Sequence, residues 1–129
     1  MKSPLLMLHD AQLERLKART ERDIYDGTPQ KVPYPYISMG EFIAKDWSDK
    51  FQAGQDVLST LHVWSQYPGK AEVLQIVDEI ERVLTESPLD LGADFHAVVD
   101  KLDDVRIIVD MDGITRHGIV TYRYLIEEV

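Results

Sequence analysis

A strongly amphipathic segment from Lys70 to Leu84 limits what this chain can fold into. Its apolar side chains recur at helical spacing and form one stripe: Val73, Ile76, Val77, Ile80, Val83 and Leu84. Charged residues occupy the opposite side of the same segment. A helix with one wide apolar stripe has to bury that stripe against another element. We therefore expect this helix to pack on a sheet built from the strands around it.

Alternating segments on both sides of this helix predict the strands of that sheet. Residues 56–65 alternate and are expected to form a central strand, in which Trp64 belongs to the core rather than to a contact surface. Residues 34–44 form another strand, whose prolines place its start at an edge. The C-terminal part is expected to contain strands at 95–99, 105–109 and 119–126, with a turn or bulge at 100–104 and a hairpin turn at Asp112-Gly113.

A second helix is expected near the beginning of the chain, over residues 4–19. Ser3 can cap it, Pro4 fits its first position, and leucines recur at helical spacing after them. A chain of 129 residues suits one compact domain with one core, covering residues 1–129. The predicted fold class is α+β: an antiparallel sheet of about four to five strands with two main helices packed on one face.

The composition disfavours several classes of function. The net charge of −9 makes the chain a poor nucleic-acid binder, because phosphate binding relies on Lys and Arg. The chain contains no cysteine, so disulfides and thiolate metal sites are excluded. No apolar run approaches the ~20 residues that a membrane span needs, and the first residues have the pattern of a helix start rather than a secretory signal.

Residues that could carry chemistry do not form a recognisable catalytic or metal-binding pattern. The four histidines His9, His62, His96 and His117 do not pair at ligand spacing, so we interpret them as packed or surface residues. The aspartates between Asp100 and Asp112 lack the ligand series of an EF-hand and are interpreted as turn formers and solvated charge. Nucleophile-elbow, dinucleotide-binding and P-loop motifs are absent. We expect no enzymatic activity, cofactor or metal.

Two polar segments carry side chains that could contact partners. In the loop from Asp46 to Gly54, Trp47 and Phe51 either fold back onto the core or lie on a mobile arm that orders against a neighbouring subunit. The pair Arg116-His117 follows the predicted hairpin turn. On composition alone, a solvent-facing hairpin is slightly favoured there over an interface.

An ordered set of short motifs resembles one phage family, the tail completion or tail-to-head joining proteins of long non-contractile-tailed phages and their prophages. The motifs are Tyr25-Asp26-Gly27 with Pro29, Pro35-Tyr36-Ile37, Gly40-Glu41, Asp46-Trp47-Ser48, Leu61-His62-Val63-Trp64-Ser65 and the segment from Asp112 to Gly118, with the helix from Lys70 to Leu84 between the last two. Each motif is weak alone, but the set covers nearly the whole chain in order. One departure is Val109, where similar sequences have an arginine.

The resemblance implies a structural virion protein that joins a completed tail to the head connector. By analogy with lambda-type tail terminators, it implies a monomer or weak oligomer in solution and a hexameric ring in the virion, through which DNA passes without specific binding. Its expected partners are the tail tube protein and a head connector or stopper protein. The expected location is the head–tail interface of the virion, reached from the host cytoplasm during assembly.

The residues expected at subunit or tail interfaces come from the two polar segments: Asp46, Trp47, Ser48, Phe51, Asp112, Arg116 and His117. Three other functions remain open at this point. The nearest is a tail terminator, which stops growth of the tail tube. The others are a small ligand-binding or enzymatic α+β domain, which would need a pocket with converging polar groups, and a nucleic-acid-binding module.

Overall fold

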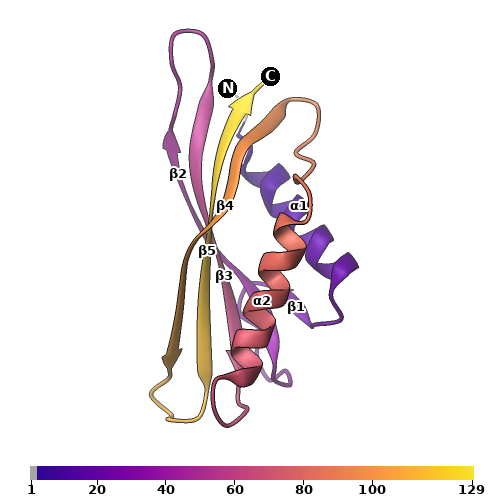
Figure 1. Ribbon diagram of the computed structural model, residues 1–129, viewed down its shortest axis with the longest axis vertical. Coiled ribbons are helices and arrows are strands. Elements are labelled where there is room, and N and C mark those ends of the chain that lie inside the picture. Colours follow the sequence, from indigo (N-terminus) through magenta and orange to yellow (C-terminus); the bar gives the residue numbers. More distant parts are fainter. Residues whose placement is uncertain (1–2) are drawn as a thin grey trace.

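The computed structural model describes residues 3–129 and contains two helices and one sheet (Figure 1). In chain order the elements are α1 (Leu5–Arg19), β1 (Ile24–Asp26), β2 (Tyr36–Asp46), β3 (Gly54–Ser65), α2 (Ala71–Thr85), β4 (Phe95–Val109) and β5 (Arg116–Glu128). Both expected helices are confirmed to within one residue at each end. No helix among the described residues is long and apolar enough to cross a membrane.

The five strands form one sheet in the order β1-β2-β3-β5-β4, and both helices cover the same face of it (Figure 1). The pairs β2–β3, β3–β5 and β4–β5 are antiparallel, whereas β1 runs parallel to β2. This arrangement confirms the predicted α+β class and the placement of the helices. The face that carries no helix is called the open face below.

The core fills the space between the sheet and the helices. Strand β3 buries Val57, Leu61 and Val63 on the helix side, while the side chains between them point to the open face. The apolar stripe of α2 is buried against these strands, as its spacing predicts. Gly118 of β5 allows this close approach, because a Cβ atom there would lie 3.1 Å from Val73 of α2.

A buried polar network lies inside this core. Gln12 of α1 is fully buried, and its amide nitrogen donates to the Tyr124 hydroxyl at 2.9 Å. Ser59 in turn donates to the amide oxygen of Gln12, also at 2.9 Å. These bonds link α1 to β3 and β5 and satisfy groups that would be costly to bury unpaired. Burial raises the pKa of the Tyr124 hydroxyl far above its usual value, so it stays protonated.

The structure corrects three expectations about the strands. Residues 95–109 form one continuous strand, so a turn at 100–104 is wrong, whereas the alternative expectation of a bulge there is confirmed by a register shift between Leu102 and Asp104. Charged residues are tolerated there because β4 is an edge strand. The turn at Asp26-Gly27 closes a short strand, β1, that was not predicted. The strand expected at 34–44 begins at Tyr36, after the prolines, and extends to Asp46.

The buried network predicts the effect of removing its central side chain. Gln12→Ala should lower the free energy of unfolding by about 2–3 kcal/mol, because it removes the donor to the buried Tyr124 hydroxyl and the acceptor for Ser59, and opens space in the core. Urea denaturation followed by circular dichroism measures the change. Gln75→Ala, at an exposed position of α2, is the matched control and should change stability little. Equal effects of the two substitutions would contradict this description of the core.

Candidate functional site

The seven residues expected at interfaces lie at opposite ends of the long sheet. Four belong to the end of β2 and the connection to β3: Asp46, Trp47, Ser48 and Phe51. Three belong to the β4–β5 hairpin and the start of β5: Asp112, Arg116 and His117. The β2–β3 connection is at the top of Figure 1 and the β4–β5 connection at the bottom. The structure therefore separates the expected residues into two surfaces instead of joining them in one site.

Hydrogen bonds build the β2–β3 tip. The Trp47 N–H donates to the Gly54 carbonyl at 2.9 Å, and the Asp49 carboxylate accepts from the backbone N–H groups of Phe51 and Gln52 at 2.8 Å. The Gln52 side chain donates to the carbonyl of Glu128. These bonds tie the tip to the C-terminal end of β5 and direct Phe51 outward.

The two aromatic side chains of this tip differ in their exposure. Phe51 is 93% exposed, so the expectation that it folds back onto the core is wrong for this residue. Trp47 is 41% exposed, and its ring lies close to Gly54, where a Cβ atom would come within 3.1 Å of it. A benzyl group that is almost fully in water is typical of a contact that needs a partner. The mobility of this segment in the free protein stays a prediction.

Asp112 organises the opposite tip. Its carboxylate accepts from the backbone N–H groups of Ile114 and Thr115 at 2.8 Å and from the Thr115 hydroxyl at 2.6 Å. The hydrogen bond from the Thr115 hydroxyl contributes most to lowering the pKa of the Asp112 carboxyl, and the two backbone bonds lower it further. The hairpin expected from the Asp112-Gly113 pair is confirmed, with Gly113 at a positive φ of 72°. Met111 is fully exposed beside it, so this end also presents an apolar side chain to solvent.

His117 joins a cluster of rings on the open face. Its imidazole stacks on Trp64 with 3.7 Å between ring centroids, and its Nε2 lies 2.7 Å from Nδ1 of His62. On the other side of His62, Nε2 lies 3.5 Å from the Glu41 carboxylate. Gly40 makes room for this ring, since a Cβ atom there would lie 2.8 Å from it. Trp64 is only partly buried on this face, so its assignment to the core is wrong.

This cluster was missed in the sequence because its members are far apart in the chain. His62 and His117 come together only through the register of β3 and β5, in which Trp64 lies opposite His117. One signal in the sequence could have indicated an unusual outer face. Strand β3 carries apolar or aromatic residues on both sides, with Leu58 and Trp64 alternating with buried Val57 and Val63. An outer face of that kind is uncommon in a sheet that faces water.

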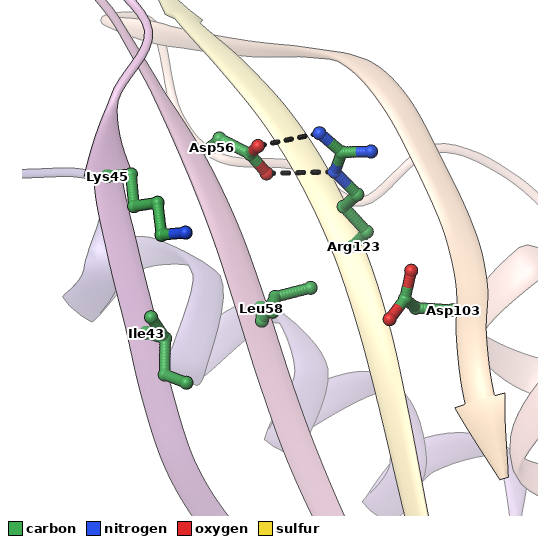
Figure 2. Close-up of a pocket in the computed structure, with 6 residues that line it drawn as sticks. All are labelled: Ile43, Lys45, Asp56, Leu58, Asp103 and Arg123. Carbon is green, nitrogen blue, oxygen red and sulfur yellow. Dashed lines mark hydrogen bonds and ion pairs between the residues drawn. The ribbon is translucent and has the colours of Figure 1, made fainter.

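The open face also contains a hollow, which lies toward the β2–β3 tip (Figure 2). Ile43 of β2 and Leu58 of β3 form its apolar part, and Lys45 lies at its rim. Beside it, the guanidinium of Arg123 donates two hydrogen bonds to Asp56, at 3.0 and 2.7 Å. This bidentate pair lowers the pKa of the Asp56 carboxyl. The hollow can therefore receive an apolar side chain flanked by charge.

The described residues do not form a metal site. Within residues 3–129, the structure contains no group of three or more His, Asp or Glu side chains that could hold a metal ion. The His62–His117 pair has the Glu41 carboxylate beside His62 and an indole stacked on His117, and it lies on an open surface rather than in a closed pocket. The geometry of both tips and of the open face is suited to contacts with other proteins.

The environment of His117 predicts a pH dependence of stability. Burial, and then the neighbouring His62, lower the pKa of the His117 imidazole. The unfolded chain takes up this proton near pH ~6.5, and the folded protein does so only at lower pH. Below about pH 6.5 the unfolded state therefore binds more protons, and the free energy of unfolding falls as the pH decreases toward the folded-state pKa.

His117→Phe keeps a ring against Trp64 and removes the titration, so the variant should lose less stability than the natural protein between about pH 7.5 and 5.5. Urea denaturation at both pH values measures the difference. His9 titrates in both proteins, and its pKa is raised by hydrogen bonds to Asp26 and Asp10, so its contribution cancels in the comparison. An equal loss in the two proteins would contradict the burial of His117.

Comparisons with known proteins match nearly the whole chain. A family model described as "Tail completion protein gp17" matches residues 6–127. The tail completion protein gp17 of Bacillus phage SPP1 is 33% identical over 94 residues, which are 73% of this chain and 69% of that protein.

Two solved structures share the fold. The structure of the bacteriophage SPP1 gp17 protein has a TM-score of 0.62 at 26% identity, covering 91% of this chain and 86% of that one. A chain in the virion of a native gene transfer agent particle has a TM-score of 0.87 at 19% identity, covering 98% of this chain and 99% of that chain. The family resemblance found in the sequence is confirmed: the chain belongs to the tail completion protein gp17 family.

Proposed function

We propose that this protein is a structural component of a phage virion that joins the completed tail to the head connector. Membership of the tail completion family over residues 6–127 is the observation that carries this proposal. The role depends on contacts between proteins, and it requires no catalytic residue, cofactor or metal. The protein would act at the head–tail interface, after assembly in the host cytoplasm.

The two separated tips support a joining role. A protein that bridges two partners needs two contact surfaces, and the sheet places its tips at opposite ends (Figure 1). Phe51 is exposed at one end, and Met111 is exposed at the other. Exposed apolar anchors with polar surroundings are typical of contact surfaces. We assign one tip to the tail tube protein and the other to the connector or stopper protein.

In the assembled virion we propose a hexameric ring, formed from a monomer or weak oligomer in solution. DNA would pass through its centre without specific binding. The net charge of −9 supports this part of the proposal, because an acidic protein does not retain a phosphate backbone. The ring would order the tips against neighbouring proteins, and burying Phe51 would offset the loss of chain entropy.

Removing the aromatic anchor of one tip tests this proposal. Phe51→Ser should weaken binding to that tip's partner by about 30-fold, the effect of losing an anchor worth ~2 kcal/mol. The change should leave the unfolding free energy almost unchanged, because the ring is in solvent. Co-sedimentation with purified tails, and separately with purified connectors, measures the binding. Phages that carry the variant should accumulate separate heads and tails.

Lys50→Ser is the matched control, since Lys50 is exposed at the same tip but offers no apolar group. Undiminished binding of Phe51→Ser to both tails and connectors would contradict the role of this tip. Tails of abnormal length in the mutant phage would instead indicate a tail terminator.

A further inference from the structure

The open face of the sheet carries several large apolar side chains among its charged ones, although no layer covers it. Its outward side chains from the four long strands include Ile43, Leu58, Trp64, Ile108, Ile119 and Leu125. An antiparallel sheet with one solvated face normally alternates apolar-in and polar-out. Four strands of 11, 12, 15 and 13 residues, with a strand spacing of ~4.8 Å and a rise of ~3.3 Å per residue, give this face a footprint of about 800 Å². That is close to the ~800 Å² that each partner buries in a stable protein interface.

The hollow on the open face has room for one aliphatic side chain, and charged side chains complete its lining: Lys45, Asp56, Asp103 and Arg123. Its volume is about 210 Å³, and Ile43 and Leu58 form its apolar part. A cavity of ~150 Å³ lined by apolar groups already holds a benzene molecule. In Figure 2 the side chain of Lys45 extends from β2 toward β3, and its amine lies between Asp56 and Leu58.

The helix layer on the other side of the molecule carries a matching protrusion. Leu74 of α2 is 48% exposed and lies outside the apolar stripe of this helix, which is buried. Asp78 follows one helical turn later and is also exposed, so the two side chains lie next to each other on the helix surface. The helix therefore presents an apolar side chain with a carboxylate beside it.

Individual unpaired charges of opposite sign occur on the two surfaces. On the open face, Lys45 and Lys101 form no ion pair with any described residue. On α2, Asp78 and Glu81 likewise have no cationic partner within residues 3–129. Charge pairs across an interface select the partner and its register. The hollow is also lined by Asp103, so the complementarity is limited to Lys45 and Lys101 facing the acids of α2.

We propose that a second copy of this chain covers the open face, with its Leu74 in the hollow and its Asp78 beside Lys45. The two contact surfaces are different and lie on opposite sides of the molecule, so each copy can bind one neighbour on each side. A head-to-tail contact of this kind generates a ring when its rotation closes. The inference rests on the proposed ring and names the surfaces that form it.

Disulfide trapping tests this contact without interference from other thiols, because the chain has no cysteine of its own. Leu58→Cys and Leu74→Cys proteins are mixed, oxidised and separated on a non-reducing gel. A disulfide-linked dimer should form in the mixture, and neither variant should form it alone. The double variant should form a ladder ending at six chains. Leu6→Cys, exposed on α1, is the control and should not link to Leu58→Cys.

A charge exchange tests the predicted register. Lys45→Glu and Asp78→Lys should each reduce trapping about tenfold, and the protein that carries both should recover it.

Trapping of Leu58→Cys alone would overturn the head-to-tail contact in favour of face-to-face packing. Rings that form on tails without trapping in the mixture would overturn this inference and leave the proposed function standing. Efficient trapping with no binding to tails or connectors would have the opposite meaning: it would support the contact and reject the joining role.

Discussion

The unbroken antiparallel pairing of β3 with β5 is the constraint on which the rest of the structure depends. It runs from Gly54 opposite Glu127 to Ser65 opposite Arg116 without a register shift, whereas the flanking strands β2 and β4 both contain irregularities. Its inner side supports both helices. Its length places the two hairpin tips at opposite ends, and its register brings His117 to Trp64 and His62. The candidate contact surfaces all follow from this one pairing.

The sequence predicts an element correctly where its periodic pattern is long and its buried and exposed faces are clearly separated. The stripe of α2 and the alternation of β3 are examples, and both elements lie within a few residues of their predicted limits. Prediction failed where tertiary context overrides local propensity. Strand β1 contains only three residues and depends on pairing with β2, and the charged middle of β4 remains extended because β5 supplies its hydrogen-bond partners.

The candidate site was only partly predictable for a related reason. Phe51 was identified because an aromatic residue in a polar loop is unusual, and the structure leaves it in solvent. The pairing of His62 with His117 needed the strand register, which a single sequence does not reveal. Two exposed tips and one uncovered sheet face support the proposed role of a subunit with neighbours on several sides. A small ligand-binding domain would instead enclose a pocket.

The most direct test of the proposed joining role is light scattering combined with negative-stain microscopy, on the protein alone and after mixing with purified tail tubes. The proposal predicts a monomer or weak oligomer in isolation and a six-fold ring at one end of each tube. In such a ring, the open face would contact the next subunit and the two tips would contact the tube and the connector. A stable monomer that does not bind tubes would contradict the proposed function.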